Sequence, residues 1–291
     1  ASVVKELVEN AIDAGSTAVV VEIRRGGMGL IRVTDNGCGI APEDAATAFL
    51  RHATSKVRDA GDLDHIATLG FRGEALASIA AVARVEMLTK PAGAETGTLV
   101  KIAASEVESV TEAGCPQGTT LVARDIFYNV PARLKFLKKD VSEGNAVESI
   151  VEKVALSHPE ISFKFLRDNR TVFHTPGDGK LLNVIYTIFG REFSRNLMPV
   201  EYTLGGVRVS GYAGKPMASR ANRSMQHFFV NGRYIKSRTM MAALEEAYQN
   251  QKMVGKFPGC VLHLTTRLSA VDVNVHPAKT EVKFGSERGV F

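Results

Sequence analysis

The sequence has no apolar run long enough to cross a membrane. Every uninterrupted apolar stretch falls well short of the roughly 18 residues that a membrane-spanning helix requires. The chain also does not open with the charged, apolar and small-residue succession of a secretory signal. These absences exclude a helical membrane protein and leave export without support. We therefore expect a soluble globular protein with no membrane partner.

Cysteine is scarce as well. Cys38, Cys115 and Cys260 are the three cysteines, an odd number, and they are far apart without CxxC or Cys/His ligand spacing. This pattern excludes a disulfide framework and a structural zinc site. It fits a reducing compartment, so we expect a cytoplasmic protein.

Positive charge is only slightly in excess. The chain has 36 Lys and Arg residues against 31 Asp and Glu residues, a formal net charge of +5. That excess permits an anionic partner such as nucleic acid, but ordinary proteins reach it too. The 291 residues, 45% of them hydrophobic, are enough for two domains with sizeable cores. The Pro- and Gly-containing stretch 175–179 is the best boundary, which predicts domains over residues 1–178 and 179–291.

Apolar periodicity, β-branched runs and turn residues predict an α/β arrangement in both domains. The first domain is expected to contain helices near residues 2–13, from Pro42, and near 73–82, 132–138 and 143–157, with strands near 18–23, 30–34, 85–89, 98–103, 119–125, 161–167 and 170–175. The second is expected to contain helices near 181–189 and 239–250, with strands near 197–204, 207–213, 226–230, 261–265 and 280–284. Asp168 and Asn169 are predicted to form a hairpin turn.

The first predicted helix carries a polar stripe opposite an apolar arc. At about 100° per residue, Glu6 and Asn10 fall one turn apart on this stripe, and Gly15 supplies the helix stop. The remaining members of the stripe are Ser2 and Asp13, and the arc consists of Val3, Val4, Leu7, Val8, Ala11 and Ile12. Taken alone, such a stripe usually means a solvated helix face. A carboxylate beside an amide is also the pair that a water-activating base and a magnesium ligand would form.

Two glycine-rich segments follow. Asp35 ends the predicted strand 30–34, and Gly37 and Gly39 come directly after it. The carboxylate would accept a hydrogen bond from the exocyclic amine of adenine, and glycines let the backbone approach a flat ring. Residues 70–76 form a glycine-bounded helix start whose free N–H groups suit phosphate oxygens, and residues 51–72 before them are expected to form a lid-like connection. Singly, the first segment is more often a turn and the second a cap.

Together these segments resemble a known superfamily. Residues 6–15, 35–40, 52–56, 70–76 and 118–120 look like the ordered nucleotide motifs of the GHKL ATPases. Within that superfamily, the sequence motifs at residues 52–56, 70–76, 128–133 and 273–279 are similar to those of the N-terminal region of the MutL family of DNA mismatch repair proteins. This resemblance runs through nearly the whole chain. It implies a GHKL (Bergerat-type) α/β sandwich followed by a ribosomal S5 domain 2-like α/β domain.

The resemblance also implies a role for each matched position. Glu6 would be the general base and Asn10 the magnesium ligand, while Asp35 would bind adenine. The other residues implied to bind ATP are Gly37, Gly39, Thr54, Ser55, Arg72, Gly73, Glu74, Ala75, Leu76 and Thr119. Lys279 of the second domain would reach the γ-phosphate, although by itself it resembles a surface lysine before an edge strand.

Arg238 is the position implied to contact DNA. It ends the basic stretch 231–238, which by local pattern is a hairpin turn with solvated charge. Contacts of this kind bind the DNA backbone without reading its sequence. Lys135, Lys138 and Lys139 form a second basic cluster that we interpret as a solvated helix end.

The function implied by the resemblance is slow, magnesium-dependent ATP hydrolysis that gates dimerisation, DNA binding and partner recruitment in mismatch repair. The implied partners are DNA, the mismatch-recognition protein MutS, downstream repair factors and a second copy of the chain, in the bacterial cytosol at the nucleoid. We expect a native segment before Ala1 to be absent here, and no nuclease activity from these residues. Two alternatives remain: a nucleotide-dependent binding switch with incidental hydrolysis, and another GHKL machine such as a topoisomerase subunit.

Overall fold

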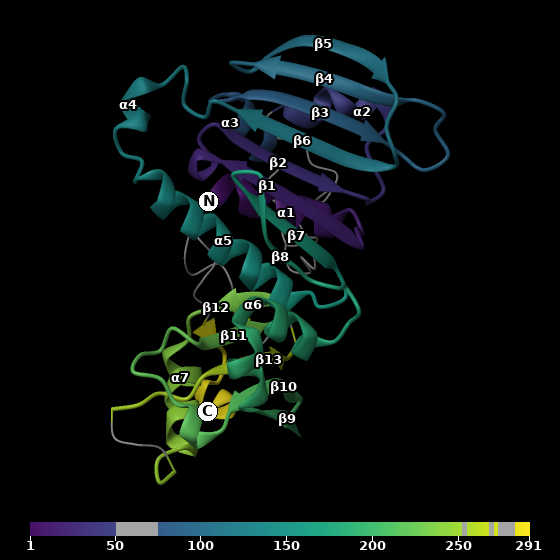
Figure 1. Cartoon of the computed structure of the whole chain (residues 1–291). Coiled ribbons are helices and arrows are strands. Elements are labelled where there is room, and N and C mark those ends of the chain that lie inside the picture. The colour runs from purple at the N-terminus through teal and green to yellow at the C-terminus, as the bar shows by residue number, and fades with distance from the viewer. Residues whose placement is uncertain (51–74, 252–254, 268–270, 273–282) are drawn as a thin grey trace. The chain divides into compact units, whose positions relative to one another are not determined.

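A computed structural model describes residues 1–50, 75–251, 255–267, 271–272 and 283–291 (Figure 1). The chain divides into two compact units. Unit 1 comprises Ala1–Glu152 and Glu160–Asp178, and unit 2 comprises Lys153–Pro159 and Gly179–Phe291. Within the described ranges, no helix combines the length and apolar character needed to span a membrane.

Unit 1 is built on an eight-stranded sheet in the order β5-β4-β3-β6-β2-β1-β7-β8. Its strands are β1 (Ala18–Arg24), β2 (Leu30–Asp35), β3 (Arg84–Lys90), β4 (Gly97–Ala103), β5 (Glu106–Ala113), β6 (Gly118–Arg124), β7 (Ser162–Arg167) and β8 (Arg170–His174). Neighbouring strands are antiparallel except β1 and β7, which run parallel. Alternate residues of β3, such as Val85 and Met87, are buried, as expected for a sheet with one covered face.

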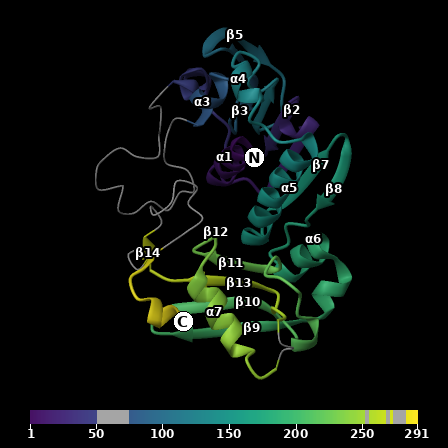
Figure 2. The ribbon, with the colours of Figure 1, turned by 90° about the vertical axis from the view of Figure 1, so that its left-hand side faces the viewer.

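Helices cover one face of this sheet. The helical elements of the unit 1 region are α1 (Ser2–Asp13), η1 (Arg25–Gly27), α2 (Pro42–Ala45), η2 (Thr47–Phe49), α3 (Ala75–Ala80), α4 (Pro131–Leu134) and α5 (Asp140–Ser157), whose C-terminal end belongs to unit 2. The first helix, α1, contacts β1, β2 and α3, while α3 contacts β3 and α2 contacts β4. Figure 2 shows α1 and α3 together on one side of β2 and β7.

The amphipathic prediction for the first helix is confirmed. Val4, Leu7, Val8 and Ala11 of α1 are at most 4% exposed, because they fill the space between the helix and the sheet. Gly15 has φ of +72°, the left-handed conformation that ends a helix and that glycine adopts at least cost. The apolar arc therefore determines which side of α1 faces the core.

Two predictions for unit 1 are wrong. Residues 106–113 form strand β5, which was not predicted, and the helix expected over 132–138 is only the single turn α4. Both errors occur in exposed chain. Val107 and Val110 of β5 are 47% and 48% exposed, so the edge strand lacks the burial pattern that periodicity detects.

Unit 2 contains a five-stranded sheet in the order β12-β11-β13-β10-β9. Its elements are α6 (Leu181–Arg195), β9 (Leu197–Leu204), β10 (Val207–Gly214), η4 (Pro216–Ala218), β11 (Gln226–Val230), β12 (Arg233–Ile235), α7 (Arg238–Ala247), β13 (Cys260–Thr265), the short pair β14 (Val271–Asp272) and β15 (Lys283–Phe284), and α8 (Glu287–Val290). β11 and β13 run parallel, and α6 bends at Gly190, which has φ of +79°.

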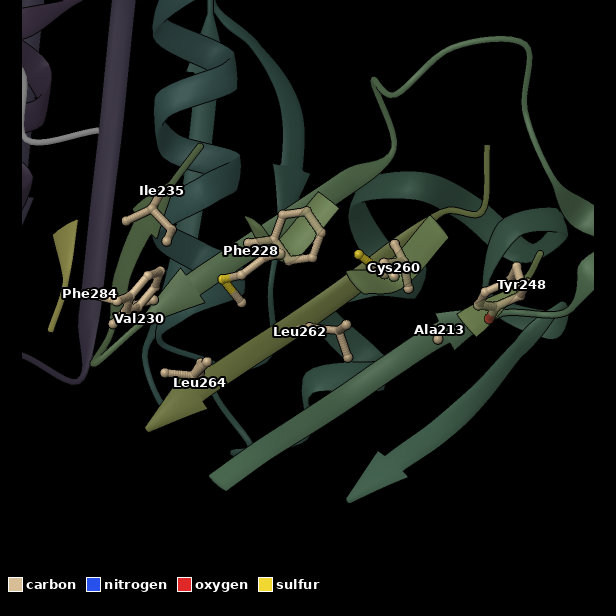
Figure 3. Packing of buried hydrophobic residues seen from close by; sticks show 11 residues of the cluster. Ala213, Phe228, Val230, Ile235, Tyr248, Cys260, Leu262, Leu264 and Phe284 are labelled. Carbon is tan, nitrogen blue, oxygen red and sulfur yellow. The ribbon is translucent and has the colours of Figure 1, made fainter. Parts of the chain in front are cut away.

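A cluster of buried side chains forms the core on one face of this sheet (Figure 3). Phe228 and Val230 of β11 and Leu262 and Leu264 of β13 contribute to it, with Met240 from α7. Phe284 of β15 joins the same cluster, so the last strand pair is tied to unit 2 by apolar contact. Removal of this area from water is the main stabilising contribution of such a cluster.

Candidate functional site

Asp35 is the best-defined polar group of unit 1. It lies at the end of β2, opposite Thr119 of β6. Its Oδ1 atom accepts the N–H of Gly37 at 2.8 Å and the hydroxyl of Ser16 at 3.2 Å. Burial raises the pKa of Asp35, and hydrogen bonds from Gly37, Ser16 and the backbone of Thr119 partly counteract this increase. The result is a half-buried carboxylate with a defined orientation at the end of the sheet.

The loop after Asp35 is tied to the C-terminal end of α1. The N–H of Cys38 donates to the carbonyl of Ala14 at 3.0 Å, and the side chain of Asn36 accepts the N–H groups of Thr17 and Ala18, both at 2.9 Å. These bonds join the end of the first helix, the start of β1 and the loop into one rigid corner. The position of the Asp35 carboxylate therefore depends on α1 as well as on β2.

Glu6 and Asn10 are half-buried on α1, the helix that contacts β2. Asp35 lies on this neighbouring strand. Ala75 and Leu76, also half-buried, begin α3, which contacts α1 as well. Three of the predicted elements are thus adjacent within unit 1.

Close packing within the protein requires glycine at positions 37 and 39, and the sequence did not suggest this requirement. A Cβ atom on Gly37 would lie 2.8 Å from both the Cβ and the carbonyl oxygen of Ala14. Gly39 has φ of +71°, and a Cβ there would overlap the backbone carbonyl of Lys90. Both glycines allow segments of the protein itself to approach closely, in addition to any role toward a ligand.

On the side of β3 and β6, a pair of threonines holds the loop that follows Asp35. The hydroxyl oxygens of Thr89 and Thr119 are 2.9 Å apart, and Thr89 accepts the N–H of Ile40 at 2.9 Å. Thr89 is fully buried. The side chain of Gln117 donates to the carbonyl of Gly37 at 3.2 Å.

The residues that support this corner were not predicted from the sequence. The residues concerned are Ser16, Asn36, Thr89 and Gln117. A signal existed for Thr89, because it shares the buried face of β3 with Val85 and Met87 and is therefore a polar residue at a core position. The burial of Glu9, which is only 8% exposed and lies 3.7 Å from Lys5, was also not predicted.

Some predicted site residues fall in the ranges that the structure does not describe. Those that lie outside the described residues are Thr54, Ser55, Arg72, Gly73, Glu74 and Lys279. Arg238 is described: it is exposed at the start of α7 in unit 2, next to Ser237, whose hydroxyl accepts the N–H of Met240 at 3.2 Å. Among the residues that the structure describes, no three His, Cys, Asp or Glu side chains cluster as a metal site.

Comparison with known proteins matches both ends of the chain to families. Residues 1–118 match the family described as histidine kinase-, DNA gyrase B-, and HSP90-like ATPase, and residues 185–291 match the C-terminal domain family of DNA mismatch repair proteins. The DNA mismatch repair protein MutL of Agathobacter rectalis is 52% identical over 290 residues, which is 100% of this chain and 45% of that relative. Over its whole length the chain is similar to MutL proteins. It spans about half the length of the curated MutL relatives that it matches.

Two solved structures agree with this similarity. The Aquifex aeolicus MutL ATPase domain complexed with ADP has a TM-score of 0.69 and 27% identity, covering 92% of each chain. The N-terminal domain of a DNA repair protein has a TM-score of 0.84 and 27% identity, covering 99% of this chain and 89% of that one. The predicted fold class, a GHKL-type α/β domain followed by a second α/β domain, is confirmed.

Proposed function

We propose that this chain binds ATP with Mg²⁺ and hydrolyses it slowly, and that this cycle gates dimerisation, DNA binding and partner recruitment in DNA mismatch repair. The observation that carries the proposal is the oriented, half-buried carboxylate of Asp35 beside the end of α1. The similarity to MutL proteins along the whole chain supports it, as does the likeness to a MutL ATPase domain complexed with ADP.

The adenine end of the proposed site fits Asp35. Donors within the protein already hold its Oδ1 atom, so little ordering is left for binding. A carboxylate of defined orientation can accept a hydrogen bond from the exocyclic amino group of adenine. Thr119 lies opposite Asp35 in the strand register, which supports its proposed place at the same base.

At the proposed metal position, the residues present fit a magnesium ion that the protein would hold through few ligands. The described residues contain no cluster of three acidic or histidine ligands, and Asn10 offers one amide oxygen from the half-buried polar stripe of α1. Mg²⁺ commonly takes most of its ligands from water and phosphate, so one side chain suffices. When bound, the ion would neutralise phosphate charge during hydrolysis.

Glu6 is the proposed base. It lies one turn before Asn10 on the same face, where it would orient a water molecule and accept its proton. Thr54, Ser55 and the residues from Arg72 to Leu76 would bind phosphate oxygens and exclude water. Lys279 of unit 2 would complete the charge at the γ-phosphate.

Calorimetric titration with a non-hydrolysable ATP analogue tests the site. We expect magnesium-dependent binding by the wild-type chain and loss of the magnesium-dependent part in Asn10→Ala. Asp13→Ala, on the same polar stripe, is the matched control and should keep that dependence. Binding that is indifferent to both magnesium and Asn10 would contradict the metal assignment.

The variant Glu6→Ala distinguishes a function that needs ATP hydrolysis from one that needs only ATP binding. If hydrolysis is the function, this variant of the full-length protein binds ATP but loses turnover and repair activity. Retained repair activity with lost turnover would leave only a nucleotide-dependent binding switch.

Partners belong to the same proposal. The full-length protein would dimerise on ATP binding, meet MutS and downstream repair factors, and act in the bacterial cytosol at the nucleoid. Arg238 would contact the DNA backbone, so Arg238→Ala should weaken duplex binding for all sequences alike and reduce its salt dependence. Arg170→Ala, an exposed arginine of unit 1, is the control.

A further inference from the structure

Thr89 is a polar residue at a core position of unit 1. Its side chain is fully buried near the end of β3, on the face that Val85 and Met87 also occupy. In the sheet β3 lies next to β6, and β6 lies next to β2, which ends at Asp35 (Figure 1). Thr119 of β6 lies opposite both Thr89 and Asp35 in the strand register. A buried hydroxyl therefore lies directly behind the adenine end of the proposed ATP site.

Three groups of the protein contact the Thr89 hydroxyl. The N–H of Ile40, in the loop after Asp35, donates to it at 2.9 Å. The carbonyl oxygen of Gly118 lies 3.2 Å from it, and the hydroxyl oxygen of Thr119 lies 2.9 Å from it. A hydroxyl has one hydrogen and two lone pairs, so three partners saturate it. Thr89 itself therefore has no hydrogen-bonding capacity left for a ligand.

The chemistry of these partners determines the direction of each bond. A backbone N–H can only donate and a carbonyl can only accept, so Ile40 occupies one lone pair of Thr89 and Gly118 accepts its hydrogen. The remaining lone pair needs a donor, and the hydroxyl of Thr119 is the group in position to provide it. Thr119 thus directs its single hydrogen toward Thr89. Toward a ligand, the Thr119 oxygen can then only accept a hydrogen bond.

Close packing of the backbone prevents these groups from rearranging. Gly118 has φ of +117°, and a Cβ atom there would overlap the carbonyl oxygen of Asp35. Gly39 of the loop approaches the carbonyl of Lys90 just as closely. The loop, β2, β3 and β6 therefore touch through their backbones. Any rotation of the Thr89 hydroxyl away from its partners would leave a buried polar group unpaired, which costs free energy.

Asp35 has the same hydrogen-bonding character as Thr119. Its Oδ1 atom accepts the N–H of Gly37 and the hydroxyl of Ser16, and an ionised carboxylate has no hydrogen to donate. Two neighbouring groups that only accept suit the 6-amino group of adenine, which donates. They disfavour a 6-oxo purine, because the oxygen at that position is also an acceptor and would leave these polar groups unpaired.

We infer that Thr89 is a positioning residue that makes the adenine end of the ATP site selective for a 6-amino purine over a 6-oxo purine. It acts through Thr119, whose hydroxyl it keeps as an acceptor. The inference rests on the proposed function, because that function assigns Asp35 and Thr119 to the base. A Thr89 that only stabilised the core would affect the stability of unit 1 but not which purine binds.

Calorimetric titration with non-hydrolysable analogues of ATP and ITP, whose bases carry a 6-amino and a 6-oxo group, tests this inference. The measured quantity is the ratio of the two dissociation constants, because a general loss of stability weakens both analogues alike. We expect the wild-type chain to prefer the ATP analogue more than about tenfold. Thr89→Val should lower this preference about fivefold, and Thr89→Ser, which keeps the hydroxyl, should retain it. Thr120→Val is the matched control, because it removes a hydroxyl 3.1 Å from that of Thr34 on the same strand but on the opposite face.

A double substitution shows whether Thr89 acts through Thr119. In the Thr119→Val background, Thr89→Val should not change the ratio further, because the hydroxyl that Thr89 orients is gone. Thr89→Cys replaces the valine variant if that variant does not fold, and it should lower the preference in the same direction.

An unchanged preference in the Thr89 variants, or an equal decrease in Thr120→Val, would overturn the inference. So would a wild-type chain that binds both analogues equally. Magnesium-dependent binding of the ATP analogue, and with it the proposed function, would stand in each of these cases. A wild-type chain that binds neither analogue would instead refute the proposed function together with this inference.

Discussion

The hydroxyl of Ser16 donates a hydrogen bond to the carboxylate of Asp35, with Oγ and Oδ1 3.2 Å apart. The same hydroxyl lies 2.6 Å from the carbonyl of Ala11, so Ser16 bridges the last turn of α1 and the end of β2. Ser16 is only 4% exposed. A buried serine directly after the helix stop thus sets the orientation of the carboxylate on which the proposed function depends.

Asp35→Asn should separate stability from binding. The burial of Asp35 raises its pKa, so the ionised form is disfavoured in the folded state and costs stability at neutral pH. The amide keeps an Oδ1 acceptor for Ser16 and Gly37, so we expect an unchanged or higher free energy of unfolding at pH 7. Loss of a charge-assisted hydrogen bond should weaken ATP-analogue binding roughly 10- to 100-fold. Calorimetry and urea unfolding measure both, with exposed Asp44→Asn as control; unaltered binding would remove Asp35 from the site.

Gly39→Ala should destabilise unit 1 much more than Gly93→Ala. Both glycines have left-handed φ, +71° and +79°, so both substitutions carry a backbone strain of about 1–2 kcal/mol. Only at Gly39 would the new Cβ meet backbone, the carbonyl of Lys90, whereas Gly93 has no heavy atom within 4 Å of that position. We expect a total loss above about 3 kcal/mol for Gly39→Ala. Equal losses in urea unfolding would show that the loop moves aside easily.

Asn36→Ala should loosen the corner between α1 and β2. The side chain of Asn36 accepts two backbone N–H groups and donates to the hydroxyl of Thr17 at 2.8 Å. Loss of these three bonds should cost about 2 kcal/mol in urea unfolding. Asn129→Ala is the matched control, because its side chain makes one bond, to the carbonyl of Ala81 at 2.8 Å, and should cost about 1 kcal/mol or less. A smaller effect for Asn36 than for Asn129 would rule out its role in holding the corner.

His227 should make unit 2 sensitive to acid. Its ring is 8% exposed and stacks on Phe189 with centroids 5.1 Å apart, and within the described residues neither ring nitrogen has a hydrogen-bond partner. Burial, with a smaller contribution from nearby Lys153, lowers the pKa of His227 to about 4. An unfolded histidine titrates near pH 6.5, so between pH 6.5 and 4 the unfolded state binds more protons. The contribution of His227 to the free energy of unfolding is therefore fully present above pH 6.5, and it is lost as the pH falls toward 4.

The loss attributable to His227 should total about 3 kcal/mol at the lower end of this window. Urea unfolding of unit 2 at pH 7 and pH 4.5 measures it, and the charged or titratable neighbours to consider are Lys153, Tyr234 and Cys260. His227→Phe keeps the stack and should remove most of the pH dependence. His174→Gln, at an exposed site in unit 1, should not. A profile unchanged by His227→Phe would mean that another group titrates.

Local pattern predicted the regular elements well wherever local chemistry decides the conformation. Asp168 and Asn169 both have positive φ and connect paired Arg167 and Arg170, which confirms the predicted hairpin turn. The hairpin turn predicted over residues 231–238 is confirmed only at its start, where Asn231 and Gly232 have positive φ; the rest of that range contains β12 and the first residue of α7. Strand β12 directly after it was missed, because three residues are too few to show alternation.

Hydrophobic periodicity did not predict the correct element where side chains are mostly exposed or do not alternate between buried and exposed positions. β5 also carries an irregular register against β4, between Lys101 and Ile102, so its side chains do not alternate regularly. The helix expected after Pro131 stops at Leu134, because Leu134 and Phe136 have no core to pack against and are exposed. Propensity for helix was present there, but the tertiary contacts that stabilise a helix were not.

By itself the sequence determined the apolar face of α1, the stop at Gly15, the strand that ends at Asp35 and the motifs that identify the family, because each depends on residues close together in the chain. Only the tertiary structure decided that Ser16 and Thr119 meet Asp35, that Asn36 holds the start of β1, and that Gly37 and Gly39 are required by neighbouring backbone. These contacts join segments far apart in sequence, and their energies depend on distances and burial that exist only once the sheet has formed.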